Sequence, residues 1–294
     1  MAGGLSSIVT PSSNPPSPSP VTGFHRVLTW KAWAPVVYGV AATVGAILFL
    51  LELGYLGVYP LSFALSEINP LLSGFYLTCE VVGVILSLGF GIGFMVGWAR
   101  TSKSLILRGF GSVYVDFFRS LPPIGLIVFA SLIGAIALKG SNLNPYEVRN
   151  ITLWLGVIAL AFHTAAYQAE IVRAGILSVP AGQVEAADAV GISRTRSMFL
   201  VVLPQAFRIS LPALGNEFSS SIKDTSLLFV IGWLELSGVA FILVSTTYET
   251  YLYGSLVIWV EVALLYFLLT YVVTRVVRGV EDLYKIPGLE AARL

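Results

Sequence analysis

Residues 73–99 read SGFYLTCEVVGVILSLGFGIGFMVGWA, and Glu80 is the only charged residue among them. A helix of about 20 apolar residues can cross the hydrocarbon core of a bilayer, so this run predicts a transmembrane helix. The four glycines from Gly89 to Gly97 superficially resemble a nucleotide-binding pattern. Within an apolar span, however, glycines favour the close packing of one helix against another.

The composition of the whole chain points the same way. Of the 294 residues, 56% are hydrophobic and 11% are charged, and the mean hydropathy is +0.84. Soluble domains carry roughly 25% charged residues, so a soluble enzyme is excluded and lipid must be the solvent for much of the surface. The formal net charge of +1 gives no indication of nucleic-acid binding. The single cysteine, Cys79, excludes an internal disulfide and a cysteine-rich metal site.

Similar apolar runs recur and predict an all-α integral membrane protein with about six transmembrane helices. The runs lie at 35–58, 73–99, 113–138, 151–175, 209–244 and 251–277. The run at 209–244 is overlong and contains Gly232, so it should bend or form two shorter helices. Residues 1–24 are rich in Ser and Pro and are expected to form a disordered tail. The first run is too long for the apolar part of a signal peptide and is interpreted as a retained helix.

The distribution of positive charge predicts which side of the membrane each loop faces, because Lys and Arg are retained in cytoplasmic loops. Fourteen of the seventeen fall on one side of the predicted spans: Arg26, Lys31, Arg100, Lys103, Arg108, Arg119, Arg173, Arg194, Arg196, Arg208, Arg275, Arg278, Lys285 and Arg293. Lys139 and Arg149 fall on the other side, and Lys223 lies within a span. We therefore expect a multi-pass protein of the cytoplasmic membrane with both termini in the cytoplasm.

The large cytoplasmic loop, residues 178–204, reads SVPAGQVEAADAVGISRTRSMFLVVLP. This pattern predicts two short helices joined by a glycine turn. Ser178 can cap the first helix, and Gly191 can take the left-handed conformation that ends it. Ser193 can cap the second helix, which is expected to stop at Pro204.

Three interpretations of this hairpin compete. It is a solvated loop, a DNA-binding helix-turn-helix, or a docking element gripped by a cytoplasmic motor. The second is disfavoured because membrane spans tether both ends and the segment lacks a dense basic face. Glu185-Ala-Ala-Asp-Ala-Val-Gly191, followed by Leu203-Pro204-Gln-Ala, resembles the EAA loop of ABC-transporter permease subunits. The resemblance implies that the following residues belong to coupling helices seated in a cleft of the ATPase subunit: Glu185, Ala186, Ala187, Gly191, Leu203 and Pro204.

The resemblance extends over residues 73–283 and is to permeases for polar amino acids, namely histidine, arginine, glutamine, glutamate and opines. The matching stretches are AYQAEIVRAG at 166–175, LPALGNEF at 211–218 and KDTSL at 223–227. One departure is RSLPP at 119–123, where the family more often has RGTPL. The resemblance implies a five-helix permease core at 73–283 that contains the EAA loop. The rest of the chain is then an extra N-terminal helix with an external loop at 25–72 and a cytoplasmic tail at 284–294.

No phosphate-binding loop of the form Gly-x-x-x-x-Gly-Lys-Ser/Thr occurs in the chain, and no catalytic or metal-binding pattern is recognisable. The chain is therefore predicted to be neither an enzyme nor a holder of its own cofactor. By the resemblance, ATP and Mg would bind a partner, a cytoplasmic ABC ATPase dimer. The other implied partners are a second permease subunit, identical or paralogous, an external solute-binding protein and a polar amino acid, but no nucleic acid. The alternative is a stand-alone secondary transporter or channel for a small polar solute.

Polar residues within the spans are candidates for a substrate path, because polar groups that face lipid are costly. They gather in two of the predicted spans: Asn216, Glu217, Lys223, Asp224, Thr225, Ser226, His163 and Tyr167. Carboxylates there would meet the ammonium of a zwitterion, and Lys223 would meet its carboxylate. The competing interpretation is a network that satisfies itself and only holds helices together. Glu170 and Arg173 are expected to support the coupling loop. The sequence does not reveal partners for Glu80, Glu235 and Glu261, which are also costly in lipid.

Overall fold

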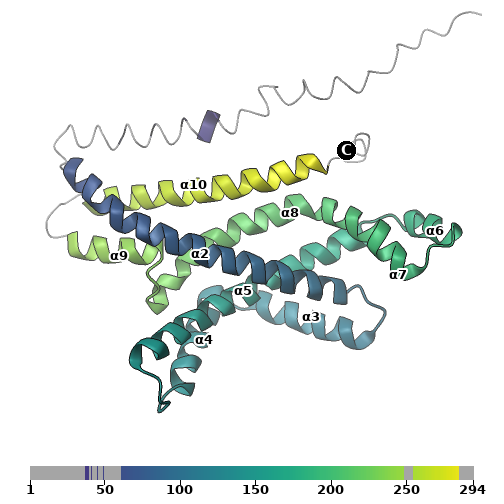
Figure 1. Ribbon diagram of the computed structural model, residues 1–294, viewed down its shortest axis with the longest axis horizontal. Helices are drawn as coiled ribbons and strands as arrows, with labels where there is room; N and C mark the ends of the chain where they lie inside the picture. The colour runs from purple at the N-terminus through teal and green to yellow at the C-terminus, as the bar shows by residue number, and fades with distance from the viewer. Residues whose placement is uncertain are drawn as a thin grey trace, which may run out of the picture. The chain divides into compact units, whose positions relative to one another are not determined.

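In the computed structural model, residues 61–247 and 254–284 are described, together with isolated residues between 37 and 49. Every regular element in this part of the chain is helical, as predicted. The elements are α2 (Leu61–Ala99), α3 (Leu105–Ser120), α4 (Pro123–Ala137), α5 (Pro145–Leu177), α6 (Ala181–Ala189), α7 (Arg194–Ser197), the π-helical turn η2 (Met198–Val202), α8 (Leu203–Asp224), the 3₁₀ segment η3 (Thr225–Ile231), α9 (Leu236–Thr247) and α10 (Gly254–Leu283). The long helices α2, α5, α8 and α10 run side by side, and α6 and α7 lie at one end of them (Figure 1).

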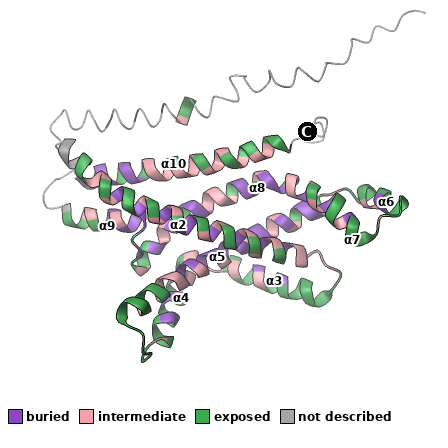
Figure 2. Ribbon diagram, viewed as in Figure 1, coloured by how far each residue is buried: buried purple, intermediate pink, exposed green. Residues whose placement is uncertain are grey.

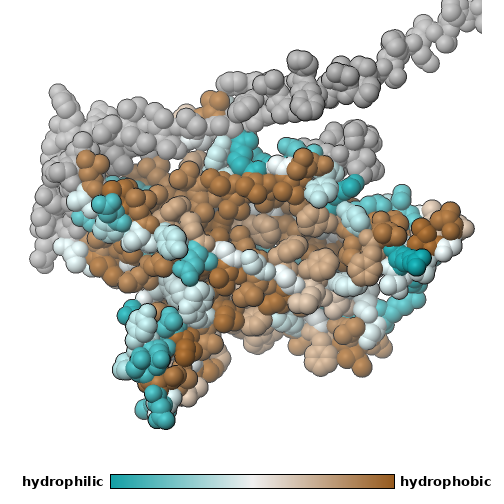
Figure 3. Space-filling view, viewed as in Figure 1, coloured by the Kyte–Doolittle hydropathy of each residue, from teal (hydrophilic) through white to brown (hydrophobic). Residues whose placement is uncertain are grey.

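Within residues 61–247 and 254–284, four stretches of helix are long and apolar enough to cross a membrane: Leu65–Ala99, Pro145–Leu177, Arg194–Ile231 and Gly254–Leu283. If the bent pair of α3 and α4 is counted as one span, it is the fifth. Apolar side chains cover the flanks of the long helices, and hydrophilic ones gather at the α4–α5 turn and near α6 and α7 (Figure 3). The predicted span at 35–58 lies outside the continuously described residues, so a total of six spans stays a prediction.

The predicted span at 113–138 is wrong as a single helix, because α3 and α4 meet at an angle of 102°. The break falls at Leu121-Pro122-Pro123. Leu121 precedes a proline and is extended, with φ −99° and ψ 141°, which is the conformation that a following proline imposes. Pro122 is also extended, and Pro123 begins α4 where a missing N–H costs nothing.

The core is built around α5, which packs against α2, α3, α4 and α8. Buried residues are accordingly concentrated along α5 and the adjoining parts of α2 and α8 (Figure 2). A Cβ at Gly97 would lie 2.5 Å from the carbonyl oxygen of Ala169, and one at Gly93 would lie 2.8 Å from the Cβ of Gln168. The predicted role of the glycines in helix packing is thus confirmed for these positions, but Gly91 has open space in front of it.

The predicted interruption of the run at 209–244 is confirmed, since η3 ends at Gly232, whose φ of +82° turns the chain before α9. Only glycine adopts this left-handed conformation at little cost. Residues 61–72, predicted to be part of an external loop, instead form the first turns of α2, with Pro70 inside the helix.

Candidate functional site

The hairpin of α6 and α7 has a rigid, glycine-dependent turn. Gly191 has a φ of +78°, and its N–H donates to the carbonyl of Asp188 at 3.0 Å. The N–H of Ile192 reaches back to the carbonyl of Ala187, also at 3.0 Å. This pair of bonds is a Schellman motif, which satisfies the last carbonyls of α6. The predicted helix–glycine–helix pattern is therefore confirmed.

Of the predicted caps of this hairpin, only the position of Ser193, at the N-cap of α7, is confirmed. Ser178 ends α5 rather than starting α6, and its hydroxyl donates to the carbonyl of Ala174 at 2.7 Å. The cap position of α6 is Pro180, and neither Pro180 nor Ser193 makes a side-chain capping bond. Pro204 does not stop the second helix, because the π-helical turn η2 already interrupts the regular α-helical hydrogen bonding directly before it and the chain runs on into α8. The second helix thus continues through η2 into α8.

The hairpin is anchored by its apolar side and exposes its other side. Val184 and Met198 pack on a cluster from the ends of α5 and α8 that includes Val172 and Ile176. Ala187 is buried, while Val190 is 76% exposed. The predicted coupling residues are distributed as follows: Glu185, Ala186, Gly191 and Pro204 exposed, Ala187 buried and Leu203 half-buried. An exposed surface of small and apolar residues on a fixed turn is suited to contact with another protein.

Beside this hairpin, a carboxylate with two arginines links α2 to α5. The carboxylate of Glu170 pairs with Arg173, whose Nε donates to it at 3.1 Å, and with Arg100 at the end of α2. Arg100 also donates to Ser112 of α3 at 3.4 Å. Glu170 and Arg173, which the sequence predicted to support the loop, are therefore in contact with each other. Arg100 is a partner of Glu170 that sequence reasoning missed.

The candidate path residues lie along the end of α8, the start of η3 and the facing part of α5. We call this set of residues the polar strip. They differ in exposure: Asn216 and Lys223 are exposed, Glu217, Asp224, Ser226 and Tyr167 are half-buried, and Thr225 and His163 are buried. Ser221 bridges the two helices, donating to the hydroxyl of Thr164 at 3.4 Å. His163 and Asp224 lie within electrostatic range of each other.

The polar strip includes one residue that the sequence analysis placed elsewhere. Arg119 was counted with the cytoplasmic loops, but it lies in the last turn of α3, and its guanidinium carbon is 5.0 Å from the ring centre of Tyr167. The ring of Tyr167 in turn lies 5.1 Å from that of His163, whose Nδ1 is 2.9 Å from the main-chain oxygen of Phe118. An exposed arginine, a half-buried tyrosine ring and a buried histidine ring thus lie in a row across α3 and α5. The available sequence pattern was the position of Arg119 three residues before the helix-breaking Pro122-Pro123.

Of the three carboxylates whose partners the sequence left unknown, Glu80 is exposed, whereas Glu235 and Glu261 are buried. Glu235 accepts hydrogen bonds from the N–H groups of Ser237 and Gly238, each at 2.9 Å, and from the hydroxyl of Tyr266 at 2.6 Å. It therefore caps α9 and ties it to α10. Glu261 is 8% exposed. Within the described ranges, no group of three or more His, Cys, Asp or Glu residues is arranged to hold a metal ion.

Comparison with known proteins bears directly on this arrangement. Residues 89–284, which include the hairpin and the polar strip, match the model of a family described as binding-protein-dependent transport system inner membrane component. The chain belongs to this family. A permease of this family, a probable glutamine ABC transporter permease of Bacillus subtilis, is 32% identical over 209 residues, which is 71% of this chain and 90% of that protein. The nopaline transport system permease of Agrobacterium fabrum is 34% identical over 221 residues, covering 72% and 87%.

Solved permease structures share the fold. An amino acid ABC transporter solved with histidines has a TM-score of 0.61 and 28% identity, covering 74% of this chain and 95% of that one. A methionine ABC transporter in inward-facing conformations has a TM-score of 0.55 at 23% identity, covering 72% and 97%, and supports the fold alone. The all-α permease fold inferred from the sequence is therefore confirmed.

Proposed function

We propose that this chain is the membrane subunit of an ATP-driven importer for a polar amino acid. Family membership supports the role of permease subunit. The substrate class is supported by relatives that are named for glutamine, nopaline, octopine and cystine. These compounds share a charged ammonium and a carboxylate. Such a solute needs both signs of charge along its path.

The hairpin of α6 and α7 is the proposed contact with a cytoplasmic ATPase dimer. Glu185 and Ala186 are exposed on α6, whose C-terminal turn is fixed by a Schellman motif, and the hairpin continues through η2 into α8. A displacement of the hairpin would therefore be transmitted along α8 toward the polar strip. This continuity is the single observation that carries the coupling proposal. ATP-driven closure of the two ATPases would pull the hairpins together, and the helices would move as rigid bodies to alternate access.

In the proposed orientation, the hairpin and both termini are cytoplasmic. The cations on the side of the hairpin, among them Arg100, Lys103, Arg194 and Arg196, support this assignment through the positive-inside rule. The α4–α5 turn is then external, facing the solute-binding protein that the family description implies.

The polar strip is the proposed substrate path. Glu217 and Asp224 would meet the substrate ammonium, while Lys223 and Arg119 would meet its carboxylate. Asn216 and Lys223 are exposed in the single chain. Exposure of such groups to lipid is costly, so we infer that a second permease subunit, identical or paralogous, faces them across the path. Glu170, which pairs with both Arg100 and Arg173, would brace α5 beside the hairpin.

Substitution of Glu185 tests the coupling. Glu185→Lys should abolish the stimulation of ATP hydrolysis by the solute-binding protein in proteoliposomes, because a reversed charge sits at the centre of the proposed contact. Glu281→Lys makes the same change at the cytoplasmic end of α10 and should leave stimulation intact. Normal stimulation in Glu185→Lys would refute the coupling role of the hairpin.

The alternative is a secondary transporter or channel that works without an ATPase. Purification under mild conditions separates the two, since the importer should retain a nucleotide-binding partner. Uptake of a panel of labelled amino acids by the reconstituted complex then tests the substrate class. A response without preference for polar amino acids would refute it.

A further inference from the structure

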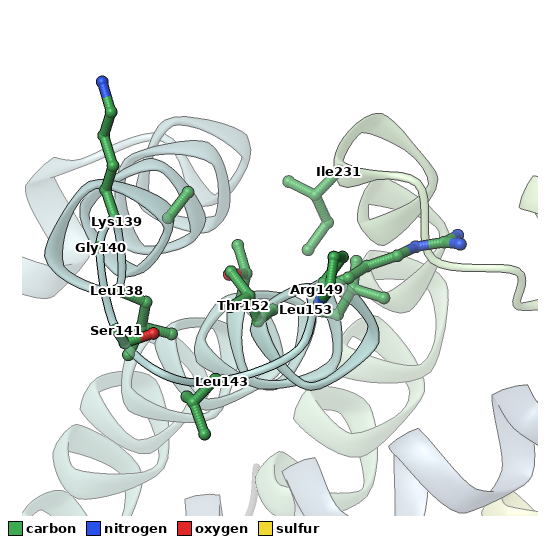
Figure 4. A pocket seen from close by; sticks show the side chains of 12 residues that line it. Leu138, Lys139, Gly140, Ser141, Leu143, Arg149, Thr152, Leu153 and Ile231 are labelled. Atoms are coloured by element: carbon green, nitrogen blue, oxygen red, sulfur yellow. The ribbon is translucent and has the colours of Figure 1, made fainter.

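The α4–α5 turn forms a hollow of about 500 Å³ with an apolar interior and a cationic rim. Its walls come from three elements, namely the end of α4, the start of α5 and the end of η3. Leu138, Leu143, Leu153 and Ile231 line it (Figure 4). The side chains of Lys139 and Arg149 extend from opposite sides of the hollow rather than into it (Figure 4).

The charge around this hollow is one-sided. Lys139 and Arg149 are both exposed, and they are the two cations that the sequence places on this side of the membrane. The nearby carboxylate of Glu147 is engaged in a capping box, accepting from the N–H of Asn144 at 2.9 Å. The residues that line the hollow therefore include two cations and no carboxylate, around an apolar centre.

The turn is also built as a fixed surface. Gly140 has a φ of +86°, and the N–H of Ser141 donates to the carbonyl of Leu138 at 3.1 Å. The capping box of Asn144 and Glu147 fixes the start of α5. A preformed surface loses little conformational entropy when a partner binds, so it is suited to repeated, transient docking.

We infer that this hollow is the docking surface for the solute-binding protein, which inserts an apolar side chain flanked by acidic residues. The inference rests on the proposed function, which makes this turn external. The apolar side chain fills the space between Leu143 and Ile231, and the flanking carboxylates pair with Lys139 and Arg149. Ile231 ends η3, which begins at Thr225 in the polar strip, so docking contacts the same segment that lines the proposed path.

Charge reversal at the rim tests the docking surface. The reconstituted permease–ATPase complex is titrated with the purified, substrate-loaded solute-binding protein of the same system, and ATP hydrolysis is measured. The double variant Lys139→Glu/Arg149→Glu should raise the half-saturating concentration of the binding protein by roughly tenfold or more, because like charges then face each other. Basal ATP hydrolysis should stay unchanged. Lys103→Glu, an exposed cation at the α2–α3 turn, is the matched control and should keep the wild-type value.

Two further measurements keep the test decisive if the double variant fails to assemble. In the wild-type complex, raising NaCl from about 50 to about 300 mM should weaken docking, because salt screens exposed charge pairs. Ala135→Trp, which fills the hollow without changing charge, should also raise the half-saturating concentration. Wild-type titration curves for the assembled rim and hollow variants, or a salt-independent wild-type curve, would overturn the docking surface alone. A wild-type complex that no binding protein stimulates would overturn the proposed function and this inference with it.

Discussion

Replacement of Glu235 by glutamine should destabilise the helix bundle, because the buried carboxylate serves several donors at once. Its Oε2 accepts from the N–H of Ser237 at 2.9 Å and from the hydroxyl of Tyr266 at 2.6 Å, with the hydroxyl of Thr78 at 3.4 Å. Its Oε1 accepts from the N–H of Gly238 at 2.9 Å. Glutamine keeps the size of the side chain but has one accepting oxygen and one donating NH₂ group.

The magnitude follows from the number of donors that lose their acceptor. If the amide oxygen of the glutamine takes the position of Oε2, its NH₂ group faces the N–H of Gly238, and two donors meet. In the reverse orientation the NH₂ group faces Ser237 and Tyr266, which then lack an acceptor. At least one buried backbone donor is therefore unpaired, which costs about 1–3 kcal/mol. For a domain of this size, a loss of about 2 kcal/mol lowers the melting temperature by roughly 4–8 °C.

The assay is thermal unfolding of the purified protein in one detergent at a fixed heating rate. Glu80→Gln makes the same chemical change on α2, where Glu80 is exposed and forms no hydrogen bond with the described residues. It should change stability by less than about 0.5 kcal/mol, as surface substitutions usually do. Tyr266→Phe removes one of the donors and should fall between the two. The reasoning fails if Glu235→Gln melts at the wild-type temperature, or if Glu80→Gln shifts it as far.

Two further predictions concern α2. Gly97→Ala should cost about 1–3 kcal/mol by overpacking against α5, since its Cβ would lie 2.5 Å from the carbonyl oxygen of Ala169, whereas Gly91→Ala should be neutral or stabilising. Equal melting temperatures for the two variants would contradict the tight interface. Arg100→Gln should cost about 1.5–3 kcal/mol by removing charged hydrogen bonds to Glu170 and should reduce transport, whereas Arg108→Gln, at an exposed position of α3, should do neither. Unfolding and uptake measurements on both variants check this expectation.

Patterns that depend on local chemistry predicted most of the helices and the hairpin. Runs of apolar residues are long enough to give the spans, and Gly191 supplies the one backbone conformation that a Schellman turn needs. The run at 209–244 was expected to bend at Gly232, and its φ of +82° confirms that expectation.

Features that depend on long-range contact could not be predicted. Thr78 and Tyr266 are brought to Glu235 only by the packing of α2 and α10 around α9. Arg119 joins the polar strip because the chain bends by 102° after it, whereas a straight span would not place it there. Ser178 was assigned to the wrong helix because its hydroxyl can serve either end, and only the extent of α5 decides between them.

The length of α5 has a mechanical consequence. Its 33 residues form one unbroken helix, which at 1.5 Å per residue is a rod about 50 Å long. One end forms part of the hollow at the α4–α5 turn, and the other leads through Ser178, Val179 and Pro180 into α6. Insertion of one residue near its middle would rotate one end by about 100° relative to the other. The hollow and the hairpin would keep their chemistry but face in different directions, so α5 sets the angle between these two surfaces.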